Sequence, residues 1–400
     1  MIIELIIALI VGVMVGTFTG ITPGIHINLV SALLLATTTT FLLGIQPLAL
    51  VIFLVAVAIT HTFVDFVPSI FLGAPDEDNF LSILPGHQML IKGNAYSAVI
   101  LTLYGSLIAI GLILILTPLF LFFLSKVYPY AQIVMPYILL IACFFLIYFE
   151  KNNRLMAIII FLLAGFLGYA TLNLPIKENL LPMFTGLFGI SSLITSIVKK
   201  QKIPSQKIIP LKNITLPKKS FLKAISASII ASPLCSFLPG LGSGQAAVIG
   251  SEVIGELNQK EFLILLGAVN TLVVGLSFIT LYTINRTRTG VAVAISKLID
   301  LTLGDIYVII ATIAIVGLLS FFITIKISKL FARRIDKINY RNLSLIIIAI
   351  LVAIILFFTG WLGLLVALIS SCLGLTCILL GIRRTHLMGC LLIPALLFYL

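Results

Sequence analysis

The sequence has few charged residues. Only 10% of its 400 residues are Asp, Glu, Lys or Arg, whereas 61% are hydrophobic, and the mean hydropathy is +1.26. Soluble domains carry about 25% charged residues, so this composition excludes a soluble globular protein. Long apolar runs such as 100–124 and 343–359 can cross about 30 Å of hydrocarbon at about 1.5 Å per helical residue. The sequence therefore predicts an all-α polytopic protein of the cell membrane.

A signal peptide and a cysteine motif are also missing. The segment 1–15 has no basic residue and no small-residue cleavage site, so we expect a retained first helix. No two of the five cysteines have the spacing of a zinc or redox site, and we interpret them as small buried hydrophobic residues. We expect no metal site and no cofactor. The cysteines are Cys143, Cys235, Cys372, Cys377 and Cys390.

Acidic residues are scarce relative to basic ones, 13 against 25, which gives a net charge of +12. A nucleic-acid-binding face would interleave aromatic and polar residues with this charge. Here the charge instead gathers between apolar spans, a pattern typical of cytoplasmic loops. The three basic clusters are Lys199, Lys200, Lys202, Lys207, Lys212, Lys218, Lys219 and Lys223; Lys326, Lys329, Arg333, Arg334, Lys337 and Arg341; and Arg383 and Arg384.

The apolar spans form two series of seven, separated by the first basic cluster. An odd number of crossings in each half inverts the second half relative to the first, as in many secondary transporters. We therefore predict a membrane repeat at 1–198, a basic cytoplasmic linker at 199–223 and an inverted repeat at 224–400. Some short spans could be re-entrant, so we expect about 10–14 transmembrane segments. The predicted spans are 2–21, 25–43, 47–68, 98–124, 130–149, 152–172 and 179–198, then 221–238, 240–257, 262–283, 303–325, 343–359, 361–381 and 387–400.

Each half contains a Pro-Gly step within an apolar segment, in "GITPGIHINL" (20–29) and "SFLPGLGSGQ" (236–245). Proline removes a helical hydrogen bond and glycine relaxes the backbone, so we expect the helix to stop and restart. A restarted helix directs free N–H groups and a partial positive charge at a bound anion. The alternative is a simple kink or an interfacial turn. The matched pair favours a binding site between the two halves.

Five ordered segments resemble the large membrane subunit of the tripartite tricarboxylate transporters. They are Pro23-Gly24 with the apolar helix that follows, "GAPDEDNF" (73–80), "PGHQMLIKGNAYSAV" (85–99), "LLPMFTGLFGISSLI" (180–194) and "FLPGLGSGQAAVIGSE" (237–252). The chain departs from the family pattern at three places and is shorter than the usual subunit. It has Gly73-Ala74-Pro75-Asp76 for Pro-Gly-x-Pro, Val269-Asn270-Thr271 for Ala-Asn-Asn, and "TINRTRTG" (283–290) for Gly-Ile-Pro-Gly.

The resemblance implies uptake of a carboxylate coupled to an H⁺ or Na⁺ gradient. It also implies two partners, a small membrane subunit and an extracytoplasmic solute-binding protein. The departures, together with the richness in Ile and Lys, suggest a divergent archaeal branch whose solute need not be a tricarboxylate.

Several charged residues could carry ions or bind the solute. His61 and Asp65 are one helical turn apart in an apolar span, where ionisable groups usually serve function. They could carry protons, or form a structural pair. Asp76 and Asp78 could coordinate a cation or lie in a solvated turn. Arg286 and Arg288 could clamp an anionic solute or lie at the membrane interface.

The candidate site thus combines the two Pro-Gly segments with polar residues of the spans. Ser243, flanked by glycines, also allows an intramembrane serine protease that uses His26 or His61 as its base. A scaffold protein fits worst, because it needs no polar residues at membrane depth. The predicted ion-coupling residues are His61, Asp65, Asp76 and Asp78. The predicted substrate-binding residues are Thr22, Pro23, Gly24, His26, Asn28, Pro239, Gly240, Gly242, Ser243, Gly244, Gln245, Asn270, Thr271, Arg286 and Arg288.

Overall fold

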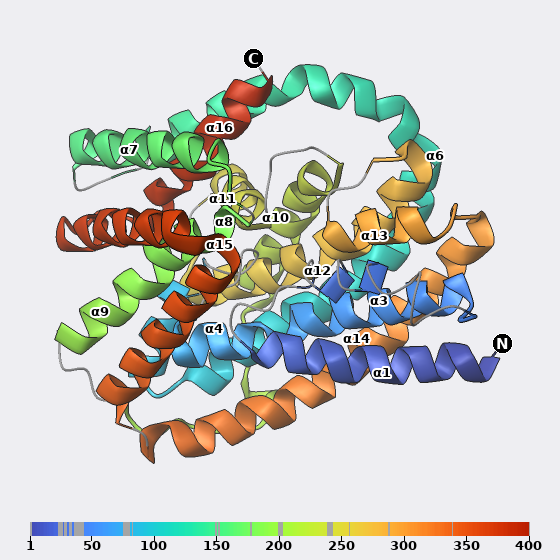
Figure 1. Cartoon of the computed structure of the whole chain (residues 1–400), viewed down its shortest axis with the longest axis horizontal. Coiled ribbons are helices and arrows are strands. Elements are labelled where there is room, and N and C mark those ends of the chain that lie inside the picture. Colours follow the sequence, from blue (N-terminus) through green and yellow to red (C-terminus); the bar gives the residue numbers. More distant parts are fainter. Residues whose placement is uncertain are drawn as a thin grey trace.

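The computed structural model is helical, with no strand in the residues it describes (Figure 1). It describes 2–22, 27, 30–31, 34–35, 44–74, 81, 83–148, 150, 153–176, 178–198, 203–237, 243–255, 257–286, 289–337 and 339–399. The elements are α1 (Ile2–Ile21), α3 (Pro47–Val64), α4 (Phe66–Leu72), α5 (Ile83–Ile91), α6 (Ala95–Tyr148), α7 (Arg154–Leu172), α8 (Leu180–Phe184), η2 (Thr185–Ile190), α9 (Ser191–Val198), η3 (Leu211–Asn213), α10 (Lys218–Phe237), α11 (Ser243–Ile254), α12 (Gln259–Ile284), α13 (Gly290–Leu298), α14 (Leu303–Arg334), η4 (Ile335–Lys337), α15 (Tyr340–Leu379), η5 (Arg384–Met388) and α16 (Gly389–Tyr399).

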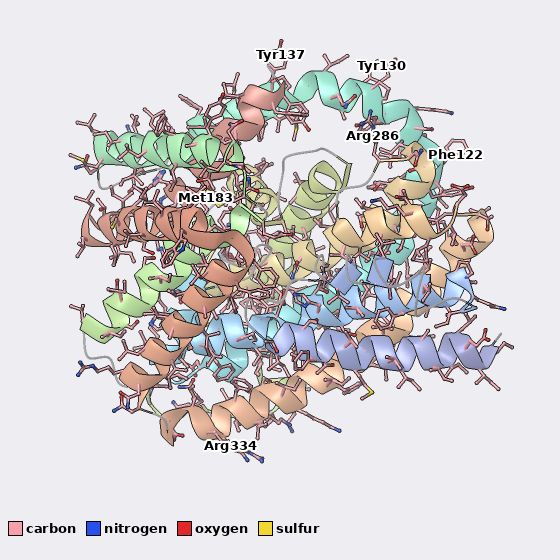
Figure 2. All side chains as sticks on the ribbon, viewed as in Figure 1. Phe122, Tyr130, Tyr137, Met183, Arg286 and Arg334 are labelled. Carbon is pink, nitrogen blue, oxygen red and sulfur yellow. The ribbon has the colours of Figure 1, made fainter. Side chains whose placement is uncertain are left out.

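Eight spans in the described part of the chain are long and apolar enough to cross a membrane. They are α1, α3 with α4, α6, α7, α8 through α9, α12, α14 and α15. Large apolar side chains point outward from these helices, as Figure 2 shows for Phe122, Tyr130 and Tyr137 on α6. A water-soluble protein would cover such a surface with charge, so the predicted all-α polytopic membrane class is confirmed.

Two helices each contain two of the predicted spans. Helix α6 has 54 residues, about 81 Å at 1.5 Å per residue, and carries Pro118, Pro129 and Pro136. It curves around the edge of the bundle instead of running straight (Figure 1). Helix α15 bends at Gly360, whose φ of 65° lies in the left-handed region that glycine adopts without strain. The predicted spans 98–124 and 130–149 therefore belong to one bent helix, whereas the predicted spans 343–359 and 361–381 are two helical parts that meet at the kink at Gly360.

Helices α10 and α11 form a hairpin. Gly250 of α11 packs against Ala227 and Ala231 of α10, an approach that requires the chain to fold back between Phe237 and Ser243. With 12 residues, α11 is only about 18 Å long. The described helix within the predicted span 240–257 is therefore too short to cross the membrane, and we infer that it is one arm of a re-entrant hairpin. A re-entrant hairpin and two full crossings both return the chain to the same side, so the predicted inverted repeat does not depend on this difference.

The directions of the central helices follow from their contacts. Helices α1, α3 and α14 run parallel. The contacts that show this are Gly12 with Phe53 and Gly20 with Val64, for α1 and α3, and Thr60 with Ser320 and Phe71 with Phe331, for α3–α4 and α14.

Helix α12 runs parallel to the first part of α6 and opposite to α14. In α6, Gly105 faces Ile264 of α12 and Ile113 faces Gly275. Tyr104 and Ile110 of α6 contact Phe321 and Gly317 of α14, respectively, so α6 and α14 run in opposite directions. The start of α6 and the end of α14 therefore lie on one side of the bundle.

Described members of the first two basic clusters lie on the side of the bundle that holds the start of α6 and the end of α14. The N–H of Lys207 donates to the carbonyl of Gly93, just before α6, at 2.8 Å. Arg333 and Arg334 end α14. Arg286 follows the other end of α12 and lies far from Arg334 in the view of Figure 2. This common side is what a topology signal requires.

We expect the side that carries Lys207 and Arg334 to face the cytoplasm, because clustered basic residues are retained there. In a cysteine-free background, a membrane-impermeant maleimide should label Arg286→Cys in intact cells. It should label Lys207→Cys and Arg334→Cys only after permeabilisation. All three positions are exposed, so access to the reagent is matched. Labelling of Lys207→Cys in intact cells would contradict the predicted orientation.

Candidate functional site

Asp65 lies at a break between α3 and α4, deep in the bundle. Its backbone N–H still donates to the carbonyl of His61 at 3.0 Å. Pro68, three residues later, has no N–H to donate to the carbonyl of Val64, so the helical pattern is interrupted. The Asp65 side chain is only 4% exposed. A carboxylate at this position needs polar partners, because burial of an isolated charge is costly.

One partner comes from the second half of the chain. The side-chain Nδ2 of Asn270 donates to Oδ2 of Asp65 at 3.1 Å, and Asn270 is 1% exposed. Beside this pair, the hydroxyls of Thr62 and Thr271 lie 3.3 Å apart. Two hydrogen bonds thus join residues more than 200 positions apart in sequence. The carbonyl Oδ1 of Asn270 is buried and has no hydrogen-bond partner within the described residues.

This contact lies near the middle of the membrane-spanning helix. Asn270 is 11 residues from Gln259, the start of α12, and 14 from Ile284, its end. At 1.5 Å per residue these intervals are about 17 Å and 21 Å. Every residue of α12 from Leu263 to Leu281 is buried. The Asp65–Asn270 pair is therefore enclosed by protein at mid-depth.

His61 connects this pair to the end of α1. Its Nδ1 lies 3.1 Å from Oγ1 of Thr19, and that hydroxyl donates to the carbonyl of Gly16 at 3.1 Å. Because the hydroxyl has one proton, it accepts from His61, which assigns the proton of the neutral ring to Nδ1. His61 is 3% exposed.

The first Pro-Gly segment begins beside Asp65. Helix α1 ends at Ile21, and a Cβ on Gly20 would lie 2.8 Å from the Cβ of Val64 and 3.3 Å from the backbone N of Asp65. Thr22 follows as a bend, with its hydroxyl donating to the carbonyl of Phe18 at 2.8 Å. The chain thus enters the Pro-Gly step at the depth of the carboxylate.

The second Pro-Gly segment has its flank at a similar depth. Ser243, at the start of α11, lies 11 residues before Ile254, where α11 ends. Asn270 lies 11 residues after Gln259, where the adjoining α12 begins. Because the two helices pack together across a short turn, equal intervals place Ser243 and Asn270 at similar depth. Ser243 is 2% exposed and Gly244 is buried.

Not every predicted residue can be placed. Pro23, Gly24, His26, Asn28, Asp76, Asp78, Pro239, Gly240, Gly242, Arg288 and the side chain of Gln245 lie outside the described residues. Arg286 is exposed, 16 residues or about 24 Å along the chain direction of α12 from Asn270. The structure does not bring Arg286 into the Asp65–Asn270 region.

Sequence reasoning missed four hydroxyl residues of this region, Thr19, Thr60, Thr62 and Ser320. The hydroxyl of Ser320 donates to Thr60 at 3.0 Å, next to His61 in α3. Threonine and serine can satisfy their own hydroxyls on the preceding helical turn, so they occur in apolar spans without a functional reason. Their signal was the run Thr60, His61 and Thr62, which places polar groups on several faces of one buried helix.

Arg383 and Arg384, which the sequence analysis interpreted only as a topology signal, belong to a second buried polar group. Glu150, after α6, accepts from Nε of Arg383 at 3.2 Å and lies 2.8 Å from Nε2 of His386. Arg384 is 6% exposed and extends away from this trio. The third basic cluster is therefore partly inside the protein, which its sequence pattern alone did not indicate.

The comparisons with known proteins agree with this arrangement. The family model described as "Tripartite tricarboxylate transporter TctA family" matches residues 6–389. The chain belongs to the TctA family. It is also 32% identical, over 389 residues and 94% of each chain, to an uncharacterized protein of Methanocaldococcus jannaschii. No solved structure matches the chain.

Membership of the TctA family confirms the resemblance that the ordered motifs predicted. The archaeal relative agrees with a divergent archaeal branch. The family is a membrane component of tripartite transport systems, so the protein is a multi-pass membrane protein of a transporter family. These comparisons do not assign the residues that couple the ion or bind the solute, so those assignments stay predictions.

The Asp65–Asn270 hydrogen bond should contribute measurably to stability. Asn270→Ala leaves the buried carboxylate without this donor, a loss of about 1–3 kcal/mol, and should lower the melting temperature followed by circular dichroism. In Asp65→Asn the same alanine change should cost less, which a double-mutant cycle measures. Thr283→Ala, in the last turn of α12, is the matched control. Equal losses in both backgrounds would show that the two side chains do not interact.

Proposed function

We propose that the protein is a secondary active transporter that moves a small anionic solute, a carboxylate, using an H⁺ or Na⁺ gradient. Membership of a transporter family supports transport in general. The observation that supports a coupled mechanism is the contact of Asp65 with Asn270 at mid-depth. A charged carboxylate is costly at this depth. Binding or release of a proton or a cation by Asp65 therefore changes the free energy of the helix arrangement around it.

Asp65 is the group we assign to ion coupling. A proton or a Na⁺ ion would neutralise its charge in the low-dielectric interior, which favours occupancy before the helices around it rearrange. Carboxylate, amide and hydroxyl oxygens are ligands for hard cations. Asp65, Oδ1 of Asn270 and the hydroxyls of Thr62 and Thr271 supply such oxygens in one place. His61 offers a titratable ring one turn away for a proton-coupled mechanism.

The solute is assigned to the two Pro-Gly segments. Helix starts present unpaired N–H groups and a partial positive charge, which suit a carboxylate. Thr22 and Ser243 flank the two steps, and their depths match those of Asp65 and Asn270. Ion and solute would then bind close together, so that occupancy of one site changes affinity at the other. The predicted residues of the steps themselves complete this site.

An intramembrane hydrolase based on Ser243 is the alternative. The transporter family speaks against it, and so does the arrangement of the site. In a serine hydrolase a buried carboxylate orients the histidine base, whereas Asp65 accepts from the amide of Asn270 and Nδ1 of His61 lies against Thr19. Transport explains why Asp65 and Asn270, from distant parts of the chain, are held together within the membrane.

The family name also implies partners. Tripartite systems contain further subunits, and we propose that this chain works with a small membrane subunit and an extracytoplasmic solute-binding protein. In that arrangement the binding protein delivers the solute to the side opposite the basic clusters, where Arg286 is exposed. Arg286 would then act on the arriving anion or on the binding protein, outside the mid-depth site.

Uptake into proteoliposomes tests the proposal. Purified wild-type protein should accumulate radiolabelled citrate or succinate when a Na⁺ or an H⁺ gradient is imposed. Asp65→Asn, which has the same shape but does not titrate or attract a cation, should reduce gradient-driven uptake at least tenfold. Asp300→Asn makes the same change at an exposed position and should have no effect. Uptake by Asp65→Asn at the wild-type rate under both gradients would refute the coupling role.

His61→Ala separates the two coupling ions in the same assay. If protons pass through His61, this variant should lose uptake driven by an H⁺ gradient. If Na⁺ is the coupling ion, uptake driven by Na⁺ should persist, because the ring is not among the oxygen ligands.

A further inference from the structure

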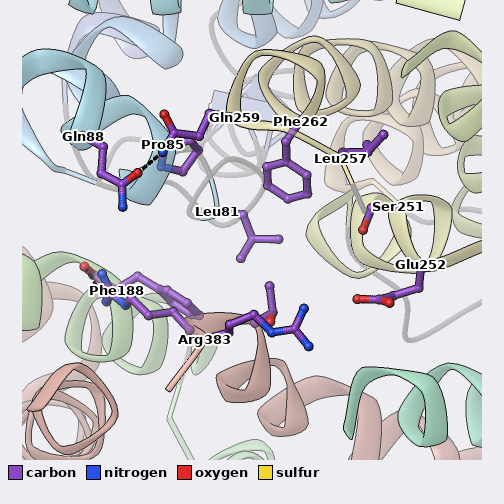
Figure 3. Close-up of a pocket in the computed structure, with 12 residues that line it drawn as sticks. Leu81, Pro85, Gln88, Phe188, Ser251, Glu252, Leu257, Gln259, Phe262 and Arg383 are labelled. Carbon is purple, nitrogen blue, oxygen red and sulfur yellow. Dashed lines mark hydrogen bonds between the residues drawn. The ribbon is translucent and has the colours of Figure 1, made fainter. Parts of the chain in front are cut away.

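A cavity of about 450 Å³ lies apart from the Asp65 region, on the side of the basic clusters. Its walls come from α5, η2, the turn from α11 to α12, and η5, as Figure 3 shows. Gln88 and Gln259, at the ends of α5 and α12, hydrogen-bond to each other across one edge. The volume falls within the range of about 300–1,000 Å³ that is typical of small-molecule sites.

Arg384 lines this cavity and is held from behind by η2. Its guanidinium donates to the carbonyls of Leu187 at 2.6 Å and Phe188 at 3.0 Å. It also donates to the hydroxyls of Ser191 at 2.8 Å and Ser192 at 2.5 Å. The π-helical pattern of η2 displaces carbonyls from regular α-helical pairing, so that they can accept from a side chain. The guanidinium is therefore fixed in position.

The positive charge of Arg384 is not neutralised. All four of its hydrogen-bond acceptors are uncharged, and no carboxylate lies within ion-pair distance of it among the described residues. Arg383, its neighbour, does have such a partner in Glu150. A buried charge without a counter-charge is costly, and in membrane proteins it marks a functional site by default.

Two polar atoms at the cavity lack partners. Nε of Arg384 and Oγ1 of Thr385 are both buried, and neither has a hydrogen-bond partner in the described part of the chain. Both residues line the cavity, and Arg384 is more than nine-tenths buried. Each of the two groups is a hydrogen-bond donor suited to a carboxylate oxygen. Such charge-assisted hydrogen bonds are the strong ones.

The opposite wall carries an acid. Glu252 of α11 lines the cavity across from η5, beside Ser251 (Figure 3). Its carboxylate repels anions, and more strongly the higher their charge. Arg383 also lines the cavity, but its charge is paired with Glu150. Arg384 is therefore the fixed cation and Glu252 the acid that act on a solute, which favours a solute with few carboxylates.

We propose that this cavity is a second, carboxylate-binding site, in which Arg384 and Thr385 hold one carboxylate of the solute and Glu252 limits its total charge. The site lies on the side of the basic clusters, separate from the mid-depth residues. It rests on the proposed transport function only for the choice of carboxylates as the solute class.

Equilibrium binding to the purified full-length protein in nanodiscs tests the site without any gradient. Radiolabelled succinate should bind more tightly than citrate. Arg384→Gln should weaken succinate binding at least tenfold, and Arg384→Lys should weaken it less, because the charge remains but the planar set of donors is lost. Glu252→Gln should strengthen citrate binding more than succinate binding, because removal of the acid relieves the more highly charged anion more.

Three further variants separate a bound solute from general effects. Leu257→Trp should abolish binding by filling the cavity that Leu257 lines. Thr385→Val, which removes only the hydroxyl, should weaken it several-fold. Lys260→Gln removes a nearby exposed charge outside this cavity and should change nothing. If Arg384→Gln does not fold, Leu257→Trp and Thr385→Val decide the question.

The results that overturn this site differ from those that overturn the transport proposal. The site is refuted if the wild type binds neither anion at millimolar concentration. It is also refuted if a folded Arg384→Gln, or both Leu257→Trp and Thr385→Val, bind succinate as the wild type does, since Arg384 is then only a structural link to η2. Asp65→Asn should keep cavity binding while it loses gradient-driven uptake. Binding without any uptake in the wild type would leave this site standing and reject gradient-driven transport by this chain without its partners.

Discussion

The burial of one carboxylate at membrane mid-depth constrains the rest of this structure. Asp65 has no bulk water nearby, so its partners must come from other helices, and these helices must come close. Glycine allows the approach: a Cβ on Gly267 of α12 would lie 2.0 Å from the carbonyl of Thr102 in α6. The same holds for Gly20 of α1 against Val64. Close packing at glycines thus builds the enclosure, and Asn270 supplies a hydrogen-bond donor to the carboxylate within it.

The short helices follow from the same constraint. The start of α11 and the end of α1 lie inside the protein. An unpaired helix end is tolerated there only if a polar group or cavity satisfies it. Their ends lie at the depth of Asp65 and Asn270, the place where such groups are available. A polar centre and interrupted helices therefore require each other.

The sequence was informative where a residue type has few uses in a membrane. Asp65 and His61 stood out in an apolar span, and the basic clusters indicated a common side. The sequence was uninformative where the interactions of a residue depend on its burial in the folded protein. Arg383 and Arg384 look alike in sequence, yet Arg383 pairs with Glu150 and Arg384 has only uncharged acceptors, because η2 folds against one of them. The bends of α6 and α15 and the shortness of α11 likewise depend on tertiary packing rather than on local hydropathy.

The two charged centres divide the proposed transport between them. Asp65 is an acid whose charge a cation or proton can remove, so its state can change during a cycle. Arg384 is a guanidinium that keeps its proton, and its hydrogen bonds to Leu187, Phe188 and two serines fix it in place. A fixed cation suits recognition of an anion, whereas a neutralisable acid suits coupling to a gradient. Their separation lets a solute occupy the cavity near the basic side without first requiring an ion at mid-depth.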